Sequence, residues 1–188
     1  MLRLRALRQA GVTLVEMLAV VAVVAITASI AIPSATPLAA FSTDAATGEI
    51  MRAVRFAQRE AVRTGAWHTV RIDTATQSLR VYRLTSSGLE DTSIPVLHPI
   101  DKRPYNLAFN TGAGPARATV TLVDFDYQSG GNSNLNILSF GPDGTPALLT
   151  GPKDGDVKAM TAGQVSISTG ANQRDLAIGT PDQRLAVG

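Results

Sequence analysis

Hydrophobic and polar positions divide the chain into three stretches with different periodicities. The first, residues 12–32, is a continuous apolar run whose polar members are Thr13, Glu16, Thr27 and Ser29. At about 1.5 Å per residue, a helix of this length spans about 30 Å, which is the thickness of the hydrocarbon core of a bilayer. The run therefore predicts a transmembrane helix.

The second stretch has the spacing of an amphipathic helix. Residues 33–43 are small and include Pro33 and Pro37, which predict a kink or a short melted segment because proline lacks an amide donor. Residues 44–64 then predict a helix, with an N-cap at Thr43 or Asp44. Its apolar face consists of Ile50, Val54, Ala57 and Ala61, and Gly65 ends the pattern.

The third stretch, residues 66–188, alternates as strands do. Trp67–Asp73 and Leu79–Leu84 predict a hairpin, because a short polar segment separates two alternating runs. Glycine and proline mark most other boundaries. Further strands are predicted at Tyr105–Asn110, Thr119–Asp126, Leu135–Phe140, Ala147–Thr150, Val165–Ser168 and Asp175–Ile178. The pattern predicts an α+β fold in which the helix packs on a mostly antiparallel sheet.

Composition narrows the class of protein. With 188 residues, 45% of them hydrophobic and 17% charged, the chain is predicted to form one domain with an appendage, which excludes a disordered chain or a multi-domain enzyme. The absence of cysteine excludes disulfides and thiolate metal sites. Its two histidines, His68 and His98, lie far apart in sequence, so no metal site and no cofactor are expected.

The charge is uneven along the chain. The formal net charge is +2, but residues 1–11 carry Arg3, Arg5 and Arg8 and no acid. Without this block, fourteen basic residues face fifteen acidic ones, a net charge of −1. A basic block before an apolar run stays in the cytoplasm, so the remaining chain is expected on the outer side of the membrane.

Three hypotheses fit this N-terminal segment: a secretory signal cleaved near Ser34–Ala40, a plain membrane anchor, and a prepilin-type signal. Glu16 helps to decide among them. A carboxylate in an apolar helix costs a few kcal/mol, so it indicates a function and a partner. If the chain is cut between Gly11 and Val12, Glu16 lies one turn from the new α-amino group. A staggered neighbouring subunit could bring its own amino group to this carboxylate and thereby set the register.

The segment Gly11-Val12-Thr13-Leu14-Val15-Glu16 resembles the prepilin cleavage and methylation signal of type IV pilins and type II secretion pseudopilins. The resemblance implies that a prepilin peptidase cuts after Gly11 and methylates the amino group of Val12. Val12 departs from the pattern, in which phenylalanine is usual after the cut. Pro33 falls where these proteins often have a helix-kinking proline.

Three other segments resemble the GspH and FimT branch of minor pilins, namely residues 55–65, 140–145 and 165–170. The resemblance implies a type IV pilin-like fold and a non-enzymatic subunit of the type II secretion pseudopilus. It also implies a single-pass protein of the bacterial inner membrane, with a cytoplasmic N-terminus and a periplasmic head. The implied domains are a leader (1–11), a transmembrane and filament-core helix (12–32) and the head (33–188). Other pseudopilins or pilins are the implied partners, and the loops 86–104 and 130–134 are expected to face them or the cargo.

A FimT/FimU-like minor pilin that assists pilus assembly or DNA uptake is the alternative. Arg52, Arg55, Arg59 and Arg63 lie at helical spacing and could track phosphates. They could equally form a solvated face that Glu49 and Glu60 partly neutralise through i, i+3 pairs. FimT-like proteins resemble one another in a Gly-Arg-x-Arg pattern near the C-terminus, whereas residues 170–175 here contain one arginine beside an acid.

Other kinds of site fit the sequence less well. Asp154-Gly155-Asp156 lacks the ligand spacing of an EF-hand and predicts a solvated turn. Gly112-Ala113-Gly114 is followed by proline and completes no nucleotide-binding motif. No nucleophile elbow accompanies either histidine, so an anchored enzyme is the weakest of the functional hypotheses.

Overall fold

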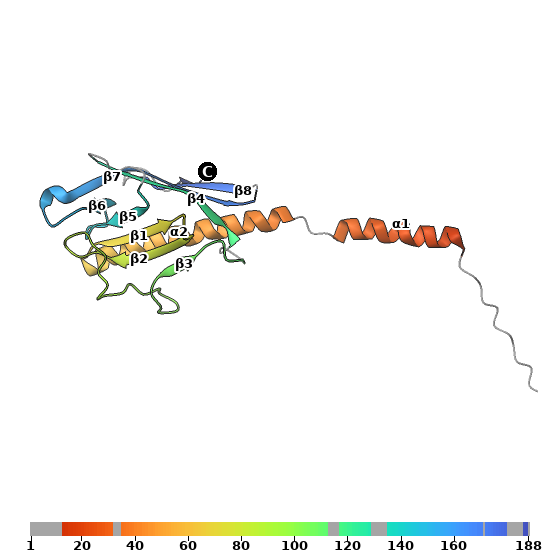
Figure 1. The fold of residues 1–188 in the computed structure, drawn as a ribbon, viewed down its shortest axis with the longest axis horizontal. Helices are drawn as coiled ribbons and strands as arrows, with labels where there is room; N and C mark the ends of the chain where they lie inside the picture. Colours follow the sequence, from red (N-terminus) through yellow and green to blue (C-terminus); the bar gives the residue numbers. More distant parts are fainter. Residues whose placement is uncertain are drawn as a thin grey trace, which may run out of the picture. The chain divides into compact units, whose positions relative to one another are not determined.

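The computed structural model describes residues 13–31, 35–112, 117–128, 135–170, 172–179 and 186–187 (Figure 1). The chain divides into two units, Met1–Ala35 and Thr36–Gly188, and each is treated by itself below. The predicted leader, the cleavage position at Gly11 and Val12, and Pro33 lie outside the described residues.

The first unit contains helix α1 (Leu14–Ala31). Thr13 caps its start, because the Glu16 amide donates to the Thr13 carbonyl at 3.0 Å and to Thr13 Oγ1 at 3.3 Å. The hydroxyl of Thr27 donates back to the carbonyls of Val23 and Val24, at 3.0 Å each. Among the residues that the structure describes, none of the helices combines the length and the apolar character that crossing a bilayer requires.

Helix α2 (Ala35–Thr64) opens the second unit and begins earlier than the sequence pattern predicts. Residues 35–43 are helical, so a melted stretch within them is excluded, while Pro33, at the start of the predicted kink or melted segment, lies outside the described residues. Pro37 lies in the first turn, where the backbone amides have no partner within the helix in any case. Thr43 is an interior residue and no N-cap, since its hydroxyl donates to the Ala39 carbonyl at 3.1 Å.

The head contains two antiparallel sheets. The first has the order β3 (Asn106–Ala108), β2 (Ser78–Arg83), β1 (His68–Asp73), β5 (Ile137–Phe140). The second has the order β4 (Thr119–Tyr127), β7 (Val157–Thr169), β8 (Asn172–Ala177), β9 (Ala186–Val187), and β6 (Ala147–Leu149) pairs with β7. A short 3-10 helix, Asp154–Asp156, precedes β7. These sheets confirm the predicted α+β class, and the β1–β2 pair confirms the predicted hairpin.

Strand β7 is much longer than the predicted strand at Val165–Ser168. Its first half is largely exposed and has no clear alternation, so local pattern did not reveal it. This half is held in the sheet by pairing with β6 and with the end of β4. Contacts that are distant in sequence therefore decide its conformation.

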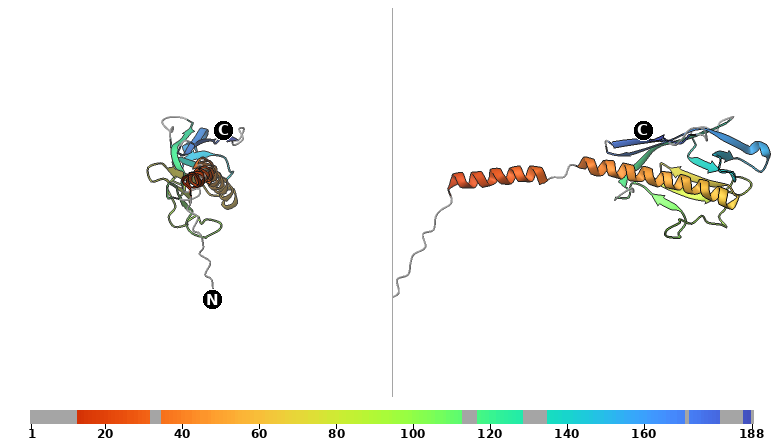
Figure 2. Two further views of the ribbon diagram at one scale, coloured as in Figure 1. Left: turned by 90° about the vertical axis from the view of Figure 1, so that its right-hand side faces the viewer. Right: turned by 180° about the vertical axis from the view of Figure 1, so that it is seen from behind.

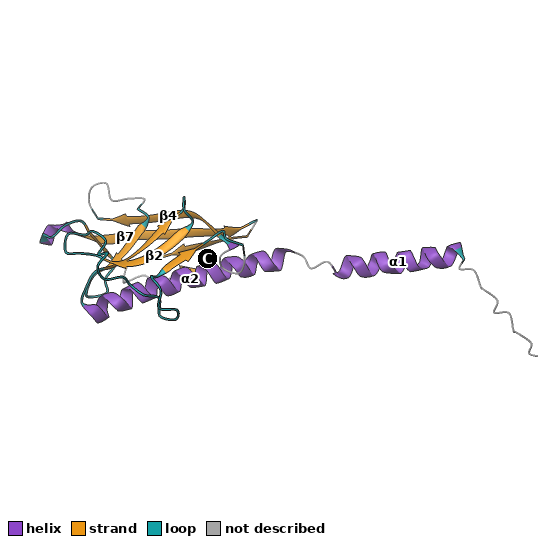
Figure 3. Cartoon of the chain, turned by 60° about the horizontal axis from the view of Figure 1, so that its bottom comes forward, coloured by secondary structure: helices purple, strands orange, loops and turns teal. Residues whose placement is uncertain are grey.

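The core lies between α2 and the two sheets, and α2 runs beside the strands (Figure 2; Figure 3). The buried face of α2 is rich in alanine, which lets the strands approach the helix closely. Its buried apolar members are Ala46, Ile50, Ala53, Val54, Ala57 and Ala61. The facing strands contribute Val70, Leu79, Phe125, Leu138, Val165 and Ile167, all less than 2% exposed. The predicted packing of the helix on the sheet is confirmed.

Candidate functional site

Glu16 lies in the first turn of α1 and is exposed. Its position, three residues after the Thr13 cap, is the one that a glutamate occupies in a capping box, and of this motif the bond from the Glu16 amide to Thr13 Oγ1 is present. A carboxylate there also interacts favourably with the partial positive charge of the helix N-terminus. The sequence analysis missed this signal, although the spacing Thr-x-x-Glu carries it. Glu16 thus stabilises the start of α1 and remains accessible to another group.

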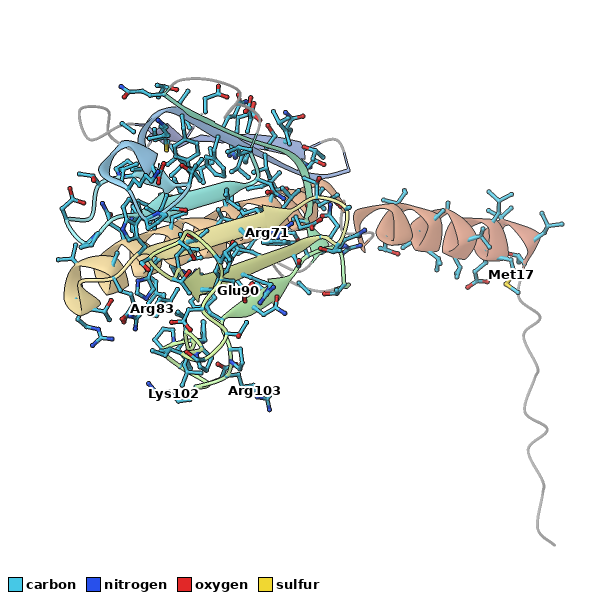
Figure 4. The ribbon with its side chains drawn as sticks, turned by 60° about the vertical axis from the view of Figure 1, so that its left-hand side comes forward. Met17, Arg71, Arg83, Glu90, Lys102 and Arg103 are labelled. Carbon is cyan, nitrogen blue, oxygen red and sulfur yellow. The ribbon has the colours of Figure 1, made fainter. Side chains whose placement is uncertain are left out.

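Apolar side chains cover the described part of α1 on every side. All residues from 13 to 27 are exposed, with Leu14 at 80%, Val15 at 76% and Val21 at 66%. The start of this helix is visible at Met17 in Figure 4. A helix that is apolar all round is normally covered by lipid or by other protein. The described part of α1 therefore requires a covering that its own unit does not supply.

The four arginines predicted to share one face of α2 are all exposed. Two of them pair with glutamates in the way the sequence indicated, Arg52 with Glu49 and Arg63 with Glu60, each at 2.6 Å. Arg63 donates hydrogen bonds to the Glu60 carboxylate, and these bonds raise the pKa of Arg63. In the part of the chain that the structure describes, Arg55 and Arg59 form no ion pair, although Arg59 Nε donates to the Arg55 carbonyl at 3.2 Å.

The arginine near the C-terminus is engaged within the head. Arg174 Nε, on β8, lies 3.0 Å from Asp44 Oδ1 on α2. The guanidinium group therefore ties the second sheet to the first half of the helix.

Of the three segments that resemble minor pilins in sequence, residues 55–65 and 140–145 contact each other. The turn at residues 140–145 packs on the end of α2, where Gln58 Nε2 donates to the Gly144 carbonyl at 2.9 Å. Asp143 closes this turn by accepting bonds from the amide and hydroxyl of Thr145, and these bonds lower the pKa of Asp143. In the third segment, Val165 and Ile167 are fully buried. The three segments therefore build the head.

Each histidine ring has its Nδ1 near one oxygen atom of the head. His68 is 3% exposed, its Nδ1 lies 2.9 Å from the Ala66 carbonyl, and burial lowers its pKa. His98 Nδ1 lies 3.3 Å from Asp101 Oδ1. No group of three histidine, aspartate or glutamate side chains is placed to hold a metal ion within the described ranges. The segment 154–156 is a turn in which Asp156 accepts a bond from the Lys153 amide at 2.9 Å.

Comparison with known proteins identifies one motif. Residues 7–32 match the family model of the prokaryotic N-terminal methylation motif. Among solved structures, the minor pseudopilin EpsH from the type 2 secretion system of Vibrio cholerae is 17% identical, with a TM-score of 0.45 over 79% of this chain and 96% of that chain. No curated protein sequence matches the chain. The chain therefore carries a prokaryotic N-terminal methylation motif at the start of an α+β protein.

Proposed function

We propose that this protein is a GspH-like minor pseudopilin, a structural subunit of the type II secretion pseudopilus that supports protein export across the outer membrane. The observation that carries the proposal is the methylation motif at residues 7–32, which contains helix α1 with its exposed apolar side chains. The chemistry of this motif concerns processing and assembly, so the proposed role is non-enzymatic.

In the proposed mechanism, a prepilin peptidase cuts after Gly11 and methylates the new amino group of Val12. The apolar segment 12–32 then anchors the protein in the inner membrane, with the head in the periplasm. On assembly, this segment passes from lipid to a fibre core made of equivalent helices from other pseudopilins. Both surroundings are apolar, so the net change in free energy for the transfer is small.

Glu16 supplies the specificity of this transfer. Its exposed carboxylate lies one turn into the mature helix. It can pair with the amino group of a neighbouring subunit only when the two helices are shifted along the fibre axis by one fixed distance. Removing one partner of a buried ion pair costs about 3–5 kcal/mol, because the other charge stays buried without compensation. The pair would therefore reject misaligned subunits.

A FimT/FimU-like minor pilin that binds DNA is the second candidate. The observation in its favour is the arginine face of α2, where Arg55 and Arg59 are exposed without an acidic partner among the described residues. Two observations weigh against it. Arg174 is already paired with Asp44, and the chain without residues 1–11 has a net charge of −1.

The proposal is tested by intact-mass measurement of the protein extracted from membranes, together with the variant Glu16→Ala. We expect the mass to lack Met1–Gly11 and to include one added methyl group. Glu16→Ala should be processed equally but should be lost from fibres isolated by shearing, because the register pair is gone. Glu49→Ala, which removes an acid from α2, is the matched control and should assemble normally.

Three results would contradict the proposal. A mass that corresponds to a chain beginning at Met1 would contradict the prepilin mechanism. A mass that corresponds to cleavage near Ala40 would contradict it as well. Normal assembly of Glu16→Ala removes the proposed ion pair.

A further inference from the structure

Helix α2 has one long side that points away from the core of the head. The right-hand view of Figure 2 shows the helix running along the near side of the head, with no described strand or loop in front of it. The opposite side packs in the core, where Ala46, Ala53 and Ala57 are each 0% exposed. We call the uncovered side the outer face of α2, and it is free to contact another surface.

The outer face is basic, because it carries the four arginines described above. Two of them pair with glutamates, so four cations and two acids leave a formal charge of +2 on this face. Arg55 and Arg59 supply the excess, since neither forms an ion pair within the described ranges. A guanidinium group can donate two parallel hydrogen bonds to one phosphate, so a row of arginines suits a surface of phosphate groups.

The same face carries an exposed aromatic ring. Phe41 is 79% exposed. It precedes Arg59 by eighteen positions, which is five turns at 3.6 residues per turn, so the two side chains lie on one line along the helix. At about 1.5 Å per residue, Phe41 and Arg63 are separated by about 33 Å along the helix axis. The outer face therefore combines an apolar end with a long basic part.

The surface of an anionic bilayer presents both groups that such a face can bind. Its headgroups carry phosphates, and the boundary between headgroups and acyl chains accepts aromatic side chains. A DNA duplex also presents phosphates, but it offers no apolar layer for the exposed ring of Phe41. The position of the ring on the arginine line thus favours lipid over nucleic acid.

In the proposed function, residues 12–32 anchor the protein in a bilayer. Phe41 follows the last residue of this segment by nine positions. The anchor keeps the outer face at a high local concentration near the headgroups, so the contact needs no long-range attraction between the protein and anions. The inference therefore rests on the proposed function.

We propose that, before assembly, the outer face of α2 lies on anionic phospholipid headgroups of the bilayer that anchors the protein. Arg55 and Arg59 bind phosphates, and the ring of Phe41 enters the boundary between headgroups and acyl chains. Incorporation into a fibre then has to release the head from the membrane surface. High salt weakens the contact, because the attraction between exposed charges is screened.

The single tryptophan of the chain allows a direct test. Full-length Trp67→Phe/Phe41→Trp is reconstituted in vesicles of phosphatidylcholine, alone or mixed with anionic phosphatidylglycerol, that contain a lipid brominated near the headgroup end of its acyl chains. We expect quenching of the introduced indole to be at least about twofold stronger in the anionic mixture, since the anchor is the same in both. Equal quenching in the two mixtures would overturn the proposal.

A matched control places the indole on another side of the head. Leu122, on β4, is 44% exposed. Trp67→Phe/Leu122→Trp should therefore be quenched weakly and to the same extent in both lipid mixtures. A response to lipid charge at position 122 as large as that at position 41 would contradict a contact through the outer face of α2.

Charge reversal tests whether the whole face makes the contact. Arg55→Glu/Arg59→Glu changes positions about 21–27 Å along the helix from Phe41, and it should lower quenching at position 41 to the level in neutral lipid. Arg55→Lys/Arg59→Lys keeps the charge and should retain most of the quenching. Lys102→Glu/Arg103→Glu changes the net charge equally at another place and should have no effect. Full quenching after reversal at positions 55 and 59 would show that the anchor alone holds Phe41 near lipid, and would overturn the proposal.

Two measurements on the same protein separate this inference from its alternatives. Retention of double-stranded DNA in a gel shift, together with no effect of lipid charge, would assign the face to nucleic acid and overturn the proposal. Intact mass reports on the proposed function. Processed protein with equal quenching in both lipid mixtures overturns the membrane contact and leaves that function in place. Unprocessed protein overturns the function, while the quenching series still decides the contact.

Discussion

At the scale of single residues, the turn at residues 140–145 depends on a glycine. Gly144 has φ of +80°, and a Cβ at this position would lie 2.8 Å from Val62 Cγ2 on α2. Its carbonyl also accepts the bond from Gln58 at 2.9 Å. Both the backbone conformation and the close approach of the helix require a residue without a side chain.

We therefore expect Gly144→Ala to lower the free energy of unfolding by about 1–3 kcal/mol. Backbone strain at positive φ and the steric contact with Val62 would both destabilise the folded state. Chemical denaturation of the purified protein measures this change. Gly155→Ala is the matched control, since a Cβ there meets no atom within 4 Å and no positive φ is involved. Equal stabilities of the two variants would show that the turn does not press on α2.

At the scale of elements, α2 is held by a face of small residues. Ala53, Ala57 and Ala61 are each 0% exposed and lie between bulkier residues of the core. Short side chains allow the helix axis to lie close to the strands, and the surrounding core is packed without room for more atoms.

Ala57→Leu should consequently destabilise the head by about 1–3 kcal/mol through overpacking. Thermal unfolding followed by circular dichroism measures the effect. Arg59→Leu places the same side chain on the exposed side of the same helix and should change stability by no more than about 0.5 kcal/mol. If Ala57→Leu were neutral, the helix and the sheets would be less closely packed than the structure shows.

Some of these elements could be predicted from the sequence and others could not. The β1–β2 hairpin was predictable because both strands alternate and a polar turn of Thr74, Ala75 and Thr76 separates them. The first half of β7 was not, because Lys158, Thr161 and Gln164 give no apolar period and pairing with β4 and β6 decides its conformation. The start of α2 was missed since Pro37 was interpreted as a break, although the first turn of a helix tolerates proline.

At the scale of the whole molecule, charge is distributed over separate surfaces. The head carries an arginine face on α2, the exposed cations Lys102 and Arg103 in the connection between β2 and β3, and the acids Asp124, Asp126 and Asp175 on the second sheet. Without residues 1–11, the total is close to neutral. A nearly neutral protein lacks the long-range attraction for polyanions that a strongly basic one has.

We accordingly expect the processed protein in detergent not to retain double-stranded DNA in a gel-shift experiment, even at low salt. Retention that falls steeply with salt and disappears in Arg55→Ala/Arg59→Ala would favour the DNA-binding alternative over the secretion role. Lys102→Ala/Arg103→Ala removes the same charge elsewhere and distinguishes the arginine face from a general charge effect.

The sequence by itself determined the features that are encoded locally. These are the methylation motif, which contains Glu16, the apolar segment, the periodicity of α2 and the hairpin, because each depends on residues a few positions apart. Only the tertiary structure decided the contact of Gly144 with α2, the pairing of Arg174 with Asp44, and the pairing of the first half of β7 with β4 and β6. Those features join residues up to 130 positions apart, and their placement depends on how the sheets pack on the helix.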